Sequence, residues 1–305
     1  MNRFAKYSWG VLGWNIIVIL WGTIVRATGS GAGCGNHWPS CNGAILPTPD
    51  RIQTVIEFTH RVMSGLALIA VLILLIWGLR KFPKGNFQRI GFIGASCFII
   101  LEALLGAGLV LFKLVGTNSS VFRAVAVSTH LLNTFILLAF LSLNAWWASG
   151  GKQIKFTDNG ALNLLFGIGI FGVVILGMSG AITALGDTLF PSTSLAETLA
   201  QQSTPGANFL VQLRIYHPVF AIAVGLYSLY FVRYLSRKFK DQIGRRLCLL
   251  VFCLVLLQWV AGLTNILLLA PVWMQVVHLF LADLVWVSYI LLAGYTFSQP
   301  DWKVK

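Results

Sequence analysis

Long apolar runs separated by short polar stretches make up most of the chain. A transmembrane helix needs about 20 apolar residues to cross the hydrocarbon core of a bilayer. The runs are continuous and do not alternate with period two, which favours helices over a transmembrane barrel. We therefore predict an all-α integral membrane protein whose eight transmembrane helices lie at 8–28, 56–79, 90–112, 122–147, 160–182, 211–233, 247–269 and 272–296.

The second half of the chain repeats the first. The segment EFTHRVMSGLALIAV resembles RIYHPVFAIAVGLYS, which aligns His60 with His217, and EALLGAGLV resembles QWVAGLTNI, which aligns Glu102 with Gln258. Each repeat has an even number of helices, so both halves share one orientation in the membrane. The repeat predicts two pseudo-symmetric four-helix bundles, at 1–150 and 151–305.

Composition and charge agree with a membrane protein. Of the 305 residues 57% are hydrophobic and only 10% are charged, whereas a soluble domain has about 25% charged residues. The net charge of +13 does not indicate nucleic-acid binding, because the basic residues gather on alternate connections and could equally attract anionic lipid. By the positive-inside rule these connections and both termini are cytoplasmic; they hold Arg3, Lys6, Arg80–Arg89, Lys152, Lys155, Arg233–Arg246, Lys303 and Lys305. No transit peptide precedes the first helix, so we expect a prokaryotic plasma membrane.

Four histidines occupy matched places in the duplicated pattern. His60, His130, His217 and His278 each follow the start of an even-numbered helix by a few residues, near the outer face. A polar ring inside a bilayer is costly, and neutral imidazole is a common axial ligand of haem iron. One such histidine is as easily a helix-packing residue, but four at matched depth favour ligands. Cofactors of four-helix bundles sit between facing helices, which predicts one haem between His60 and His130 and another between His217 and His278.

The first outer loop contains two cysteines with a histidine between them. Cys34 and Cys41 lie on the oxidising side of the membrane, where a structural disulfide, a redox-active disulfide and a metal site with His37 are all open. The corresponding loop of the second half has no cysteine and has room for a short helix. The other cysteines lie in apolar helices and are interpreted as packing thiols: Cys97, Cys248 and Cys253.

Acidic and basic residues near the histidines differ between the halves. Glu57 precedes His60 by three residues, so both project from one helix face. An acid beside a haem steers protons or stabilises developing positive charge; the alternative is a helix-start glutamate favoured by the helix dipole. Glu102 and Asp283 lie deeper, where an acid is a functional candidate. Four arginines near the outer face are candidate contacts of haem propionates, against ordinary snorkelling: Arg26, Arg61, Arg123 and Arg214.

Three motifs resemble those of the haem A synthases, and the resemblance covers essentially the whole chain. They are the loop VRATGSGAGCGNHWPSC, the helix-two segment EFTHR and the weaker helix-three segment EALLGAGLV. The resemblance implies an enzyme that oxidises the C8 methyl group of haem O to the formyl group of haem A, by two hydroxylations and loss of water. It also implies haem O synthase and haem–copper oxidase assembly as partners. A homo-oligomer is left open.

The resemblance also implies roles for individual residues. His60 and His130 would ligate the substrate haem, Glu57 would assist its oxidation, and His217 and His278 would hold a haem b that passes electrons. Cys34 and Cys41 match the outer-loop pair of the family. The chain departs from the family at Glu102, where an amide is expected, and in the second half, which lacks the cysteine pair of some relatives.

Two other functions compete with this one. A diheme b-type electron carrier explains the four histidines equally well, but it gives no reason for an acid in one half alone. A transporter also uses parallel repeats, but it needs a polar central pathway, and the membrane acids are few and the histidines lie near one face.

The cysteine pair gives a first testable prediction. If Cys34 and Cys41 form a disulfide, intact protein resists alkylation at these thiols until a reductant is added. Site-resolved mass spectrometry of the alkylated protein measures this. Labelling of either thiol without reductant would contradict the disulfide.

Overall fold

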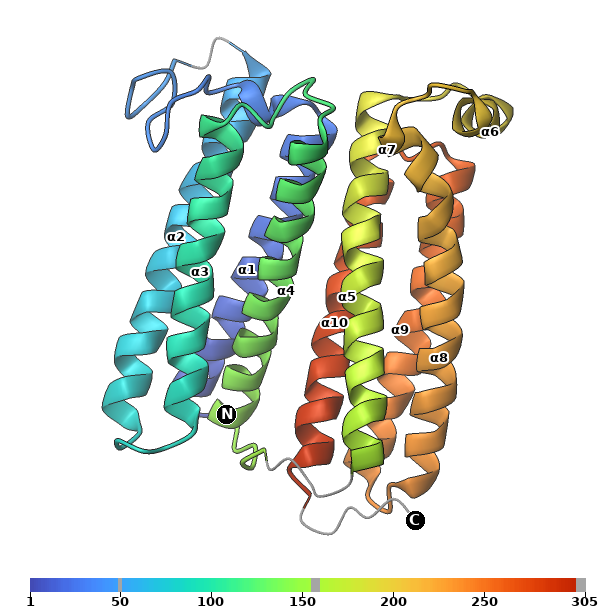
Figure 1. The fold of residues 1–305 in the computed structure, drawn as a ribbon. Helices are drawn as coiled ribbons and strands as arrows, with labels where there is room; N and C mark the ends of the chain where they lie inside the picture. The colour runs from blue at the N-terminus through green and yellow to red at the C-terminus, as the bar shows by residue number, and fades with distance from the viewer. Residues whose placement is uncertain (49–50, 155–159, 300–305) are drawn as a thin grey trace.

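A computed structural model describes residues 1–48, 51–154 and 160–299, which excludes Lys155, Lys303 and Lys305 of the charge pattern. Its described part contains eight helical spans long and apolar enough to cross a membrane, as the sequence predicts (Figure 1). The protein is thus a multi-pass membrane protein. The long helices are α1 (Arg3–Ala27), α2 (Ile52–Lys81), α3 (Gln88–Leu111), α4 (Val121–Ala148), α5 (Gly160–Leu189), α8 (Tyr216–Lys238), α9 (Gln242–Leu267) and α10 (Val272–Phe297).

The long helices stand in two groups of four (Figure 1). Helices α1 to α4 form one group and α5, α8, α9 and α10 form the other; α4 packs against α5 and α10, and α1 packs against α10. Helix α1 begins and α10 ends at the same end of the structure. The opposite end, called the loop end below, has the connections after α1, α3 and α5 and corresponds to the side that the charge pattern predicts to be outer.

Several helix boundaries differ from the prediction. Helix α2 begins at Ile52 and not at 56, so Glu57 lies in its second turn. The expected helix 211–233 lies within the helical span Phe209–Lys238, but its start is not regular α-helix, because α7 (Phe209–Gln212) and a 3-10 turn (Leu213–Ile215) precede α8. Pro218 lies in the first turn of α8, and a proline has no N–H for a helical bond to the preceding turn. His217 is therefore the second residue of α8.

A short helix covers the loop end of the second group, as the loop length predicts. Helix α6 (Leu195–Ser203) begins with a capping box, in which Ser194 Oγ accepts from the backbone N–H of Glu197 at 3.1 Å. The hydroxyl and the backbone N–H of Thr193 donate to the Glu197 carboxylate, and these bonds lower the pKa of Glu197.

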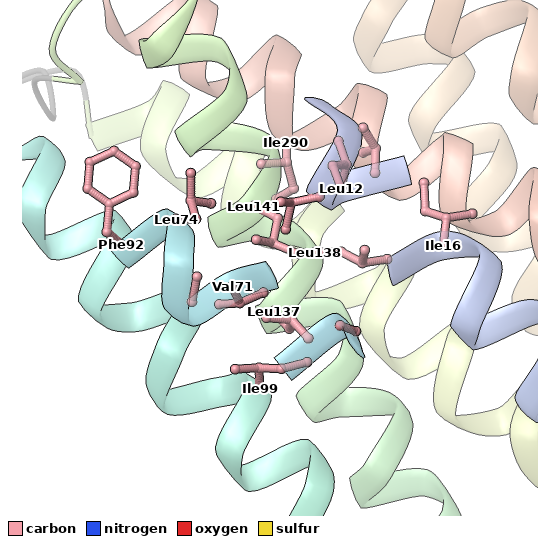
Figure 2. Packing of buried hydrophobic residues seen from close by; sticks show 14 of the residues in the cluster. Leu12, Ile16, Val71, Leu74, Phe92, Ile99, Leu137, Leu138, Leu141 and Ile290 are labelled. Atoms are coloured by element: carbon pink, nitrogen blue, oxygen red, sulfur yellow. The ribbon is translucent and has the colours of Figure 1, made fainter. Parts of the chain in front are cut away.

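One apolar core fills the first group and continues into the second (Figure 2). The Trp286 indole of α10 stacks on Phe135 of α4 with ring centroids 4.9 Å apart, and its N–H donates to the Phe135 carbonyl at 2.7 Å. Lipid gives helices no hydrophobic reason to associate, so close side-chain packing holds them together. The labelled core side chains are Leu12, Ile16, Val71, Leu74, Phe92, Ile99, Leu137, Leu138, Leu141 and Ile290.

Close packing of α3 against α4 depends on a glycine. A Cβ on Gly91 would overlap Asn144 Oδ1 and lie 2.7 Å from the Trp147 ring, whereas a Cβ on Gly10 of α1 meets nothing within 4 Å. We expect Gly91→Ala to destabilise the protein by about 1–3 kcal/mol through overpacking and Gly10→Ala to leave stability unchanged or slightly higher. Thermal unfolding in one detergent compares the two variants. Equal melting temperatures would contradict the packing.

Candidate functional site

The structure brings the predicted histidine pairs together within each half. The His217 and His278 rings have centroids 6.3 Å apart and are nearly perpendicular, at 88°. His60 and His130 are close enough for their charges to interact. All four histidines lie in the part of their helix that is nearer the loop end. The first pair comes from α2 and α4, and the second pair comes from α8 and α10.

Three of the imidazoles pack against glycines of a neighbouring helix. A Cβ on Gly22 would lie 3.2 Å from His60 Cε1, one on Gly180 would lie 2.9 Å from His217 Cε1, and one on Gly262 would lie 3.1 Å from His278 Cε1. A side chain at any of these three glycine positions would therefore crowd an imidazole ring, and glycine leaves the space that the ring occupies. Alignment of the two halves of the sequence pairs Gly262 with Gly106. It does not pair Gly22 with Gly180, because these two glycines are one residue out of register with the aligned histidines His60 and His217.

Hydrogen bonds hold one ring nitrogen of two histidines: Ser179 Oγ is 3.1 Å from His217 Nδ1, and Gln258 Nε2 is 3.3 Å from His278 Nε2. A partner on one nitrogen fixes the ring and leaves the other nitrogen for a metal. Glu102 Oε1 is 3.4 Å from His130 Nδ1, within ion-pair distance, but His130 Nδ1 and His60 Nδ1 are buried without a hydrogen-bond partner among the described residues.

The second imidazole pair fits a haem iron. An imidazole–metal bond is about 2.0–2.1 Å long, so two nitrogens across one ion are about 4 Å apart, and the ring centroids lie farther out. The 6.3 Å between the His217 and His278 centroids leaves room for such an ion. In the first pair, the buried Nδ1 atoms of His60 and His130 have no hydrogen-bond partner among the described residues, which suits rings that are oriented for another ligand.

Glu57 is a buried carboxylate held by the outer loop. It is 3% exposed; its Oε2 accepts from the backbone N–H of Cys34 at 2.8 Å, and its Oε1 accepts from Arg61 at 2.5 Å and 3.2 Å. Because Glu57 lies in the second turn of α2, its interpretation as a helix-start residue favoured by the dipole is wrong.

Arg61 ties the same loop to α2. Its Nη1 donates to the carbonyl oxygens of His37 at 2.7 Å and of Ser40 at 2.6 Å, besides the bonds to Glu57. A disulfide joins Cys34 and Cys41, both fully buried, so neither thiolate is free for a metal. The described residues also contain no cluster of three His, Cys, Asp or Glu that suits a metal ion. The disulfide, Arg61 and Glu57 therefore form one connected unit beside His60.

The other three arginines all donate to acceptors within the protein, so the propionate contacts stay a prediction. Arg26 donates to Ala184 O at 2.6 Å and also to Thr188 and Gln275, which links α1 to α5 and α10. Arg123 donates to Gly116 O and Asn118 O, both at 2.7 Å, and Arg214 donates to Gly186 O at 2.6 Å and Phe190 O at 2.7 Å.

Two acids complete the charged groups near the sites. Asp187 forms an ion pair with Arg214, with Nε 2.9 Å from Oδ1; sequence reasoning missed it because α5 was expected to end at 182. Asp283 is fully buried in α10, and neither of its carboxyl oxygens has a hydrogen-bond partner in the described part of the chain. The candidate site is thus defined by the histidine pairs together with Glu57 and Glu102.

Comparison with known proteins agrees with this arrangement. The chain matches the COX15-CtaA model, described as cytochrome oxidase assembly protein, over residues 5–290. It is 27% identical to a heme A synthase of an Exiguobacterium species over 281 residues, 92% of this chain and 89% of the relative. It is 40% identical to a heme A synthase of Halalkalibacterium halodurans over 128 residues, 42% of each chain.

A longer relative carries a different name. The chain is 49% identical over 292 residues to a protein of Thermus thermophilus named protoheme IX farnesyltransferase, and the match covers 96% of this chain but 48% of the relative. The chain thus spans about half the length of this relative. Together the matches confirm the resemblance to the haem A synthases, and the chain belongs to the COX15-CtaA family of cytochrome oxidase assembly proteins.

Proposed function

We propose that the chain is a haem A synthase, which oxidises the C8 methyl group of haem O to a formyl group. The observation that carries the proposal is Glu57, a buried carboxylate one helical turn from His60 and held by Cys34 and Arg61. The second half has Arg214 at the equivalent position, so an acid one helical turn before the histidine occurs in the first half alone. This asymmetry favours a reacting site in the first half and distinguishes the proposal from a diheme electron carrier.

The farnesyltransferase name of the Thermus relative does not change this assignment. The chain spans 89% of the Exiguobacterium heme A synthase but 48% of the Thermus protein. We therefore assign the prenyl transfer in that name to the half of the relative that this chain does not span. In the Thermus protein, a prenyl transferase that acts on protohaem is joined to a relative of this chain. This fusion supports a haem O synthase as the working partner of this chain. The product would then serve the assembly of a haem–copper oxidase.

The two histidine pairs take different parts in the proposal. His60 and His130 hold haem O, and His217 and His278 hold haem b. Haem b, when bound, would pass the four electrons of this oxidation one at a time to an external electron acceptor. The packing of His217 on Gly180 and the contact of Ser179 with its Nδ1 fix that imidazole, so its other nitrogen keeps one direction.

Glu57 acts on protons beside the first pair. Each hydroxylation of the methyl carbon removes electrons and protons, and a carboxylate within reach of the reacting carbon accepts those protons. Arg61 and the Cys34 N–H hold the carboxylate in place, and Arg61 also joins it to the loop end, where water is near. We further propose that this end faces away from the cytoplasm of a prokaryotic cell, with both termini inside, as the basic residues indicate.

Replacement of Glu57 tests the proposal. Glu57→Gln keeps the shape and the hydrogen bond from Cys34 but removes the proton acceptor, so we expect conversion of haem O to fall by about 10²–10⁴-fold while both haems stay bound. Co-expression with a haem O synthase, acid extraction and chromatography with mass detection measure haem O, its alcohol and haem A.

The control is Glu197→Gln, which removes a partly exposed carboxylate of α6 at the same end of the protein. This variant keeps wild-type output. Haem A output from Glu57→Gln equal to that of the control would remove Glu57 from the mechanism.

A further inference from the structure

The carboxyl group of Glu102 on α3 meets three polar groups from one face of α4. Thr134 Oγ1 donates to Oε1 at 2.5 Å, Asn133 Nδ2 donates to Oε2, and His130 Nδ1 is 3.4 Å from Oε1. Positions i, i+3 and i+4 of a helix share one face. Both Asn133 and Thr134 are buried, at 3% and 4% exposure. The face of α4 that presents His130 thus also surrounds the carboxylate.

The second half lacks this arrangement. Gln258 stands at the position of Glu102, and the residues three and four places after His278 are Leu281 and Ala282, where the first half has Asn133 and Thr134. The amide nitrogen of Gln258 is 3.3 Å from His278 Nε2, and its Oε1 has no hydrogen-bond partner in the described part of the chain. The acid and both its donors therefore occur together, beside His130 alone.

The hydrogen-bond partners indicate how the carboxylate faces the histidine. An ionised carboxylate only accepts hydrogen bonds, through about four lone-pair directions on its two oxygens. Asn133 and Thr134 each occupy one oxygen and hold the group against α4. His130 Nδ1 lies 3.4 Å from Oε1 but makes no hydrogen bond to any described residue. The carboxylate therefore acts on the imidazole through its negative charge, and a carboxylate beside a ligand histidine raises the basicity of the ring.

We propose that Glu102 is a positioning residue that gives the haem of the first half a lower reduction potential than the haem of the second half. Its carboxylate lies 3.4 Å from His130 Nδ1, and the negative charge there makes His130 the stronger electron donor of the two halves' ligands, with Nε2 facing away from Glu102 as the nitrogen for the iron. A stronger donor favours ferric iron, and hydrogen bonding outside the ligand shell is one of the means by which proteins set haem potentials. The neutral Gln258 has no such effect on His278.

The proposal rests on the two-haem function above and gives it a direction. Electrons pass spontaneously from a centre of lower potential to one of higher potential. With Glu102 in the first half and Gln258 in the second, transfer from the substrate haem to the acceptor haem is favourable. With glutamine at position 102 and glutamate at position 258, electrons would instead stay on the substrate haem, which is the haem that must be oxidised.

Potentiometric titration of the purified protein loaded with iron protoporphyrin IX tests the proposal, because conversion of haem O then plays no part. The wild-type protein should show two one-electron potentials, and the lower one should be absent from His130→Ala. Glu102→Gln should raise the lower potential and leave the higher one in place. A tenfold change in the ferrous-to-ferric preference corresponds to about 59 mV, and we expect a shift of this size or larger.

Thr134→Val is the matched control, since it removes one donor from Glu102 but keeps the carboxylate beside His130. Its shift should be well below that of Glu102→Gln; equal shifts would show that the cluster acts by packing alone. If Glu102→Gln loses the haem of the first half, the reciprocal variant Gln258→Glu decides, because it should lower the potential of the second half.

Two wild-type potentials that both stay in place in Glu102→Gln, or a Gln258→Glu variant without a lowered potential, would overturn the inference. Conversion of haem O without a potential shift in Glu102→Gln refutes this inference alone. A potential shift in a protein that never converts haem O refutes the proposed synthase function alone.

Discussion

A polar group inside a membrane bundle is costly unless it finds a partner within the protein, because lipid offers none. Glu57 shows how far this constraint reaches. The carboxylate is satisfied by the Cys34 N–H and by Arg61, and Arg61 in turn holds the carbonyls of the loop that the disulfide closes. The outer loop, the start of α2 and the face that carries His60 are therefore one unit, and a change in any of them reaches the others.

The same constraint gives the two halves different chemistry. The duplication supplies each half with an imidazole pair, but the partners of those pairs have diverged. Arg214 replaces Glu57 and binds Asp187 and the carbonyl of Gly186, while Gln258 replaces Glu102. A repeated scaffold thus keeps two similar sites, and single changes of charge beside the histidines distinguish them; in the proposed function, the first site is the one that reacts and the second accepts electrons.

The pattern of apolar residues was sufficient to predict the eight helices and the pairing of histidines, because helix length and matched depth depend on composition alone. The start of α2, the 3-10 turn before α8 and the end of α5 were not predictable in this way, since they depend on partners distant in the sequence. Gly22 and Gly180 were missed for a similar reason: only the packed structure shows that each faces an imidazole. Pro218 was the one local signal for the break before α8.

In the proposed function one chain holds two haems and modifies one of them. The most direct measurement is the haem content of the purified protein after co-expression with a haem O synthase. A haem A synthase should then contain haem b together with haem O, its alcohol or haem A. Haem b alone, with haem O available in the cells, would contradict the synthase function and favour an electron carrier, and a protein without any haem would contradict both.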